Sequence, residues 1–330
     1  MKHKLSLITF ILCHSIFFYV AVAPVTAQVQ NFRAATALSY IERGIKWFAK
    51  REYAQAEADF DLAIASDPRC AEAYYNRAIT RRQLGKLAEA LTDFDHALQI
   101  NPRMLEAYMN RGALRFLIGD SDGAISDSSK AIELNPKLAE AWGSRGQARC
   151  EKGDLEGGIA DLDQALKLNP RIAKIWGNRG WGRVLKHDLT GAISDYTREI
   201  KLDPGSAVAY CDRGAVRQQT GDLDGALADY NQALKLNPGL DTTWFNRGLV
   251  WQTKENLRQA ELDFTQAIEL NPRLPSAYAQ RGLVRLSQGR AAEAQADFDN
   301  CLQLDKDLKE SLERGIAEVK QQLTMHASIR

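Results

Sequence analysis

The sequence has few of the residues and motifs that mark enzymes and metal sites, and its charges nearly cancel. Five histidines and five cysteines are spread over 330 residues, with no CxxC pair, HExxH, GxSxG or glycine-rich phosphate loop. Lysine and arginine total 43 against 42 aspartate and glutamate, so the chain lacks the basic field that nucleic acid requires. We therefore expect no enzymatic activity, no metal, no cofactor and no nucleic-acid partner.

Cysteine is too sparse to build a disulfide framework. The four cysteines after the first 27 residues are Cys70, Cys150, Cys211 and Cys301, and none has a partner nearby in the sequence. An oxidising compartment would permit disulfides, but lone cysteines at such intervals are typical of small apolar packing residues. We expect free thiols.

A long apolar run occurs at the N-terminus. A basic "MKHK" precedes the apolar segment Leu5–Ala23, Pro24 interrupts it, and Val25–Ala27 offers small or compact residues before Gln28. This layout predicts a signal peptide over residues 1–27 and export to the periplasm or cell envelope. An uncleaved anchor, which would place the chain at a membrane, is the alternative, because 19 residues is near the length that spans a bilayer.

Proline is rare as well, with nine residues, and its placement reveals a repeat. Seven prolines follow one another at intervals of 34 residues, and Asp or Asn precedes each of them. These prolines are Pro68, Pro102, Pro136, Pro170, Pro204, Pro238 and Pro272. Because Asn and Asp readily close a helix and proline disfavours the α conformation of the residue before it, each pair predicts a helix end.

Between these stops the apolar pattern predicts two amphipathic helices in each period. In the period that begins at Ala71, Tyr74 and Ala78 share one face of a first helix, which ends at Gly85. Phe94 and Ala97 share one face of a second helix. Spacings of three and four residues indicate helices and not strands.

A 34-residue helix-turn-helix unit with aromatic, Gly, Ala and Pro at these offsets resembles the tetratricopeptide repeat, of the "Asn-Arg-Gly" type. The resemblance implies an all-α fold, a right-handed α-solenoid, after a short linker at residues 28–36. A C-terminal capping helix and tail at 309–330 complete it. The eight expected repeats are 37–70, 71–104, 105–138, 139–172, 173–206, 207–240, 241–274 and 275–308.

Two charged residues recur in all eight repeats. An arginine stands on every first helix and an aspartate on every second helix, as in Arg145 and Asp161. One interpretation is a ladder of arginines for an anionic ligand. The other, which we favour, is that each partly buried arginine is neutralised by an aspartate, because an unpaired buried charge is costly. Arg145, Asp161, Pro136 and Pro170 are then structural residues.

The resemblance places a partner-binding surface on the concave face, which the first helices form. The sixth position of these helices holds Asn76, Asn110, Asn178 and Asn246, and the other repeats have Glu42, Ser144, Asp212 and Gln280. A side-chain amide offers a donor and an acceptor that match a peptide bond. The asparagines are therefore candidate ligands of an extended peptide, or else solvated residues with no such role.

Apolar residues at the fifth, ninth and twelfth positions of the same helices add a candidate contact surface. They include Tyr75, Ile79, Met109, Phe116, Trp181 and Phe245. Gly143 and Gly177 occupy the fifth position in adjacent repeats, where missing side chains predict a hollow beside Trp181. The alternative is that Trp181 packs against its neighbours.

The turns "GDSDG" and "GDLDG" have the aspartates of a calcium loop but lack its third ligand and its distal glutamate. We expect Asp122 and Asp224 to cap the second helices instead.

Together these features predict a non-enzymatic scaffold that binds an extended protein or peptide segment on its concave face, in the assembly of a cell-envelope complex. The alternative is a structural solenoid that packs against copies of itself, as a homo-oligomer, or against another solenoid. The fold alone names no partner.

Overall fold

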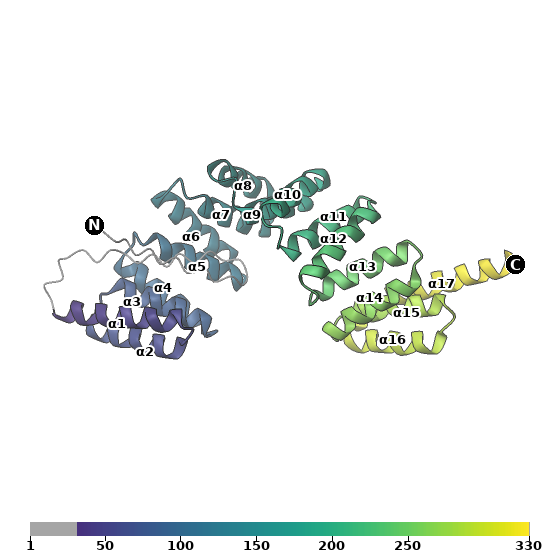
Figure 1. Cartoon of the computed structure of the whole chain (residues 1–330), viewed down its shortest axis with the longest axis horizontal. Helices are drawn as coiled ribbons and strands as arrows, with labels where there is room; N and C mark the ends of the chain where they lie inside the picture. The colour runs from purple at the N-terminus through teal and green to yellow at the C-terminus, as the bar shows by residue number, and fades with distance from the viewer. Residues whose placement is uncertain (1–31, 330) are drawn as a thin grey trace. The chain divides into compact units, whose positions relative to one another are not determined.

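The computed structural model describes residues 32–329, which contain seventeen α-helices, one short 3-10 helix and no strand (Figure 1). The predicted signal peptide at residues 1–27 and the cut before Gln28 lie outside these described residues. Within them, every helix is too short or too polar to cross a membrane.

The first sixteen helices follow one another as helix-turn-helix pairs. The first helices of the pairs, which we call inner helices, are α1 (Phe32–Ala49), α3 (Ala71–Gln83), α5 (Leu105–Leu117), α7 (Ala139–Glu151), α9 (Ala173–Leu185), α11 (Ala207–Gln219), α13 (Asp241–Thr253) and α15 (Pro275–Ser287). The second, or outer, helices are α2 (Tyr53–Ser66), α4 (Leu87–Ile100), α6 (Ser121–Leu134), α8 (Leu155–Leu168), α10 (Leu189–Leu202), α12 (Leu223–Leu236), α14 (Leu257–Leu270) and α16 (Ala291–Leu304). A 3-10 turn, η1 (Lys306–Leu308), leads into α17 (Lys309–Ile329).

The described residues form two compact units, one up to Gly182 and the other from Arg183 onward. The boundary lies inside α9, in the repeat where Glu199 takes the place of the usual small alanine.

The asparagine–proline and aspartate–proline pairs end the outer helices as predicted. Asn101 is an example: its backbone N–H donates to the carbonyl of Ala97 at 2.8 Å, and its backbone leaves the helical region, with φ −125° and ψ 88°. Its side-chain oxygen then accepts from the backbone N–H of Arg103 at 3.1 Å. This turn satisfies the end of the helix and redirects the chain, which proline at the next position reinforces.

The prolines serve a second purpose where an inner helix carries tryptophan. The indole N–H of Trp142 donates to the carbonyl of Pro136, and that of Trp176 donates to Pro170, both at 2.9 Å. Each bond ties the turn to the helix that follows it.

The expected caps, Asp122 and Asp224, are wrong by two residues. Asp120 and Asp222 are the N-caps, and they accept from the backbone N–H groups of Gly123 and Gly225 at 2.8 and 2.9 Å. Asp122 instead forms an ion pair with Lys152 of the next repeat. The earlier aspartate caps because it stands just before the first helical residue, where its side chain reaches the third N–H of the helix.

Small residues let the two helices of a pair approach closely. A Cβ added to Gly146 of α7 would lie 2.7 Å from the carbonyl oxygen of Gly158 on α8, closer than real Cβ atoms come. Fully buried Phe60, Phe94 and Phe264 fill the wider gaps in other pairs. At the C-terminus, Leu312 of α17 is buried against Phe298 and covers the apolar side of the last pair. The four cysteines are free thiols, as predicted.

Arginine–aspartate pairs join the two helices of a repeat. Arg145 Nε donates to Asp161 Oδ2, and Arg145 Nη2 donates to Asp161 Oδ1, both at 2.8 Å. Arg149 Nη1 donates a third bond to the same carboxylate at 2.9 Å. The same two-point pair joins Arg43–Asp59, Arg77–Asp93, Arg111–Asp127, Arg213–Asp229, Arg247–Asp263 and Arg281–Asp297. This geometry is that of arginines neutralised within the fold, and not of a series of arginines left free to bind an anionic ligand.

The same arginines also connect one repeat to the one before it. The remaining nitrogen of Arg77 donates to Asp61 of the preceding outer helix at 2.6 Å, and its guanidinium lies 5.5 Å from the ring centre of Tyr74. Burial lowers the pKa of Arg77, but its bonds to Asp93 and Asp61 outweigh burial and raise it overall. The arginine series is therefore engaged within the fold.

Candidate functional site

The sixth-position asparagines of the first unit form hydrogen bonds within their own unit. The amide nitrogen of Asn76 donates to the carbonyl of Glu72 at 2.7 Å, one turn back on α3. That of Asn178 donates to Gln147 Oε1 on α7 at 3.1 Å. Each of these two amide groups therefore already uses one N–H donor within the unit.

Three residues expected on an exposed wall are buried, which corrects the prediction. Tyr75, Ile79 and Asn110 are only 5%, 3% and 3% exposed. Asn110 donates both to the hydroxyl of Tyr75 at 3.1 Å and to the carbonyl of Glu106 at 2.9 Å. The Tyr75 ring lies 6.0 Å from that of Phe94, so α4 covers it. These side chains hold α3, α4 and α5 together and do not face a partner.

The predicted hollow at Gly143 is also wrong. A Cβ at Gly143 would lie 3.1 Å from both Cγ1 and Cδ1 of Ile175, so the side chain of Ile175 already fills the space. Trp181 packs against the buried cluster that contains Cys150 and Leu162, which agrees with the alternative interpretation. The sequence does not reveal this because the filling residue comes from the next repeat.

The other candidate contact residues are half-buried. Met109 packs beside buried Ile132 and Ala141, and the Phe245 ring lies 5.7 Å from that of Phe264. Phe116 is partly exposed near the end of α5. Each therefore exposes only part of its side chain.

The second unit presents a different row at the same register. Its inner helices α11, α13 and α15 carry Asp212, Asn246 and Gln280 at the sixth position, and α17 carries Arg314 at the equivalent place. None of these four side chains forms a hydrogen bond or ion pair with another residue of the described chain. Asp212, Asn246 and Gln280 are half-buried, and Arg314 is exposed.

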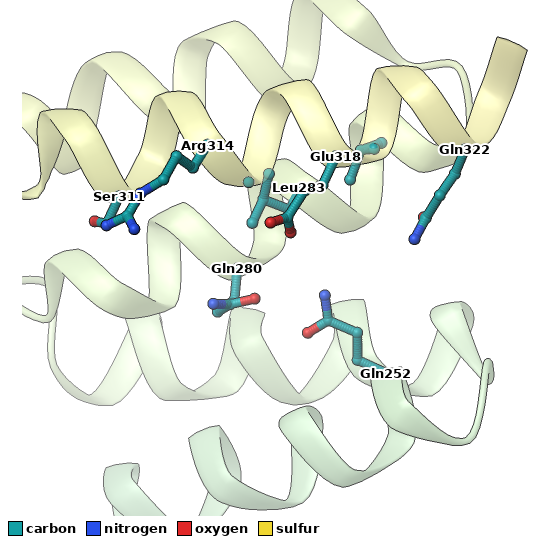
Figure 2. A pocket seen from close by; sticks show the side chains of 9 residues that line it. Gln252, Gln280, Leu283, Ser311, Arg314, Glu318 and Gln322 are labelled. Atoms are coloured by element: carbon teal, nitrogen blue, oxygen red, sulfur yellow. The ribbon is translucent and has the colours of Figure 1, made fainter.

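A polar hollow of about 440 Å³ adjoins this row at the C-terminal end. Figure 2 shows Gln252 of α13 and Gln280 of α15 pointing toward it, with Arg314 and Glu318 on α17 across from them. The remaining lining residues are Leu283, Ser311, Gly315, Val319 and Gln322. The hollow therefore offers amide donors and acceptors, one cation and one carboxylate.

Asp212 is the most perturbed carboxyl group of this face. Burial raises the pKa of Asp212 from 3.8 to about 6, and no cation offsets the effect. Nearby titratable groups are the hydroxyls of Tyr196 on α10 and Tyr230 on α12 and the thiol of Cys211, whose pKa values Asp212 helps to raise after burial. A desolvated carboxylate without a counter-ion is a strong acceptor for a ligand cation.

Sequence reasoning gave Asp212 and Gln280 no separate role, and it missed Gln252, Arg314 and Glu318. Continuing the 34-residue frame from Gln280 leads to Arg314, so the register could have identified it. The hollow itself could not be found this way, because it requires α17 to lie beside α15.

Comparison with known families agrees with the repeat geometry. Three models of the tetratricopeptide repeat match the chain, over residues 71–104 and 207–240, over 144–207, and over 105–138 and 275–308. The chain belongs to the tetratricopeptide repeat family. Its predicted fold class, an all-α solenoid of helix-turn-helix units, is thereby confirmed.

Solved structures share this fold at low sequence identity. A tetratricopeptide repeat protein from Parabacteroides merdae is 19% identical, with a TM-score of 0.63 over 76% of this chain and 99% of that chain. Pseudomonas aeruginosa pilF is 17% identical, with a TM-score of 0.56 over 68% and 99%. A chain of the APC/C hetero-tetramer Cut9–Hcn1 is 15% identical, with a TM-score of 0.62 over 80% and 52%. No curated protein matches the sequence.

The tetratricopeptide repeat fold supports a protein-protein interaction scaffold, and members of this family bind protein or peptide partners. Within residues 32–329, no group of three or more His, Cys, Asp or Glu side chains is placed to hold a metal ion.

Proposed function

We propose that this protein is a non-enzymatic scaffold that binds an extended segment of a partner protein along an inner-helix face. The observation that carries the proposal is the row Asp212, Asn246, Gln280 and Arg314, which makes no polar contact within the described chain. In a domain whose buried outer-helix aspartates are paired with arginine, such a row is best explained by a partner that completes it.

The amides of this row suit a main chain more than a particular side chain. Asn246 and Gln280 each provide an N–H donor and a carbonyl acceptor, the pair that a peptide unit requires. An extended segment can therefore lie across α11, α13 and α15 and exchange hydrogen bonds with successive inner helices. Asn76 and Asn178 have already used a donor, so we assign them a secondary role.

We further propose that the protein works in the periplasm or cell envelope, in the assembly of a complex there. The support is the basic, apolar and small-residue pattern of residues 1–27. Mass spectrometry of the N-terminus of the natural protein tests it: a chain that starts at Gln28 supports export, and a chain that keeps Met1 contradicts cleavage.

Site-specific photo-crosslinking in the producing cell tests the binding face. A photoreactive phenylalanine analogue at Asn246 or Gln280 should capture another protein, and the same analogue at Ala228, exposed on outer helix α12, should not. Adducts only at Ala228 would place the working surface elsewhere. Adducts that consist of two copies of this chain would support the self-associating solenoid instead.

A further inference from the structure

The buried carboxylates of the second unit fall into two kinds. Asp229 accepts two bonds from Arg213 and one from Arg217, and Asp263 accepts two from Arg247. Asp212 is half-buried on α11 yet receives no such bond from any described residue. Removing a carboxylate from water without pairing it costs free energy, so an unpaired one on an inner helix points to a ligand that pairs it.

We propose that the inner-helix face of the second unit selects a partner segment with a lysine or arginine side chain, whose cation pairs with Asp212. The inference rests on the proposed function and specifies the chemistry of the segment. It makes Asp212 the position that sets specificity, while Asn246 and Gln280 hold the main chain.

The geometry sets the length of the segment. Packed helices lie about 9 Å apart, so three steps from α11 to α17 span about 27 Å. An extended chain covers about 3.3 Å per residue, so about eight residues reach from Asp212 to Arg314. The basic residue lies at one end of that stretch, about three residues from the part that meets Asn246.

Charge at the other end favours a basic segment too. Arg314 lies along α17 among Glu310, Glu313 and Glu318, and of these glutamates Glu313 also pairs with Lys309 at 4.0 Å. The guanidinium therefore gives no net positive field that would select an acidic residue. Asp212 and these three glutamates outnumber Arg314 and Lys309, which disfavours an acidic segment or a polyanion.

Panning of a random nine-residue peptide library, displayed on phage, against the full chain tests this inference. We expect the selected peptides to share a Lys or Arg at one fixed position. Replacing that residue by Gln in a synthetic copy should weaken binding about tenfold to a hundredfold, because a desolvated charge pair is lost. The same replacement should matter less than about threefold for D212N.

A variant that moves the carboxylate sharpens the test. In Asp212→Asn/Asn246→Asp the charge lies one inner helix farther along, so the preferred basic position should shift by about three residues. The matched control is Asp212→Asn/Ala228→Asp, which restores the net charge on the outer helix and should not restore the preference.

The outcomes separate the two proposals. Selected peptides with no basic residue in common would overturn the role of Asp212 while supporting the binding face. A basic preference that survives unchanged in D212N would overturn that role as well. If the folded full chain selects no peptide at all, both the role of Asp212 and the binding face are overturned.

Discussion

The two units differ at one register position of the same repeat. In the first unit the buried amide of Asn110 donates to the hydroxyl of Tyr75, whereas in the second unit Asn246 bonds to no described residue. The residue 35 positions earlier explains the difference. It is Tyr75 for Asn110, but Cys211 for Asn246 and Phe245 for Gln280.

This comparison shows that a repeat position has no fixed role. Phe245 has no hydroxyl to offer, and the thiol of Cys211 already lies 3.1 Å from the hydroxyl of Thr243. Whether a sixth-position amide is available to a partner therefore depends on the preceding inner helix. The first unit uses its amides to hold its helices together, and the second leaves them open.

The largest expected effect is the loss of stability on replacing a buried, arginine-paired aspartate, and it can be compared between the two units. Asp161→Ala leaves Arg145 and Arg149 without their shared carboxylate and should lower the free energy of unfolding of the first unit by about 3–5 kcal/mol. Asp263 has one arginine partner, because Trp251 replaces the second, and Asp263→Ala should cost about 2 kcal/mol.

Urea unfolding followed by circular dichroism measures both changes. If the two units unfold in separate transitions, each variant should shift its own transition. Equal losses from the two variants would mean that the second arginine contributes nothing.

The next effect concerns Asp212 and depends on pH. Asp212→Asn removes a charge that burial disfavours, so it should stabilise the second unit by about 1–3 kcal/mol at pH 7.5. The folded pKa of about 6 lies above the ordinary 3.8, so the penalty is complete above pH 6 and fades as pH falls toward 4.

Unfolding free energies of D212N and wild type, measured at pH 7.5 and pH 4.5, check the direction of this pH dependence. The gain of D212N over wild type should fall to about a third at pH 4.5, where the folded wild-type protein binds a proton at Asp212 and the unfolded chain is still mostly ionised there. A gain that is the same at both pH values would mean that the ionisation of Asp212 is not its cause. A loss of stability in D212N at pH 7.5 would mean that Asp212 has a cation partner in the free protein.

A smaller pair of effects tests the difference between the bonded Asn110 of the first unit and the open Asn246 of the second. Asn110→Ala removes two internal hydrogen bonds of the first unit and should cost about 1–2 kcal/mol. Asn246→Ala removes none and should change stability by less than about 0.5 kcal/mol. Thermal unfolding of the two variants, made in the same chain, measures the difference. A comparable loss for N246A would contradict the open face of the second unit.

The smallest expected effect is at Gly143. Gly143→Ala should gain about 1 kcal/mol from helix propensity and lose a similar amount because the new Cβ crowds Ile175 at 3.1 Å. We expect a net change below about 0.5 kcal/mol in urea unfolding. A stabilisation by the full value of about 1 kcal/mol would mean that the space beside Trp181 is open.

The sequence by itself determined the repeat, its helices and where they end, because proline spacing and local hydrogen bonding of Asn and Asp act within a few residues of each other. It also indicated the pairing of Arg145 with Asp161, since a charge that recurs in every repeat belongs to the repeat.

Tertiary structure decided which inner-helix side chains remain available. Tyr75, Asn110 and Gly143 sit at positions that the helical period assigns to an exposed wall, yet residues one repeat away cover or bind them. Asp212 and Arg314 remain available to a partner because no residue of a neighbouring repeat pairs with them. Burial and pairing are set by contacts between residues about 34 positions apart, which a periodic pattern within one helix does not contain.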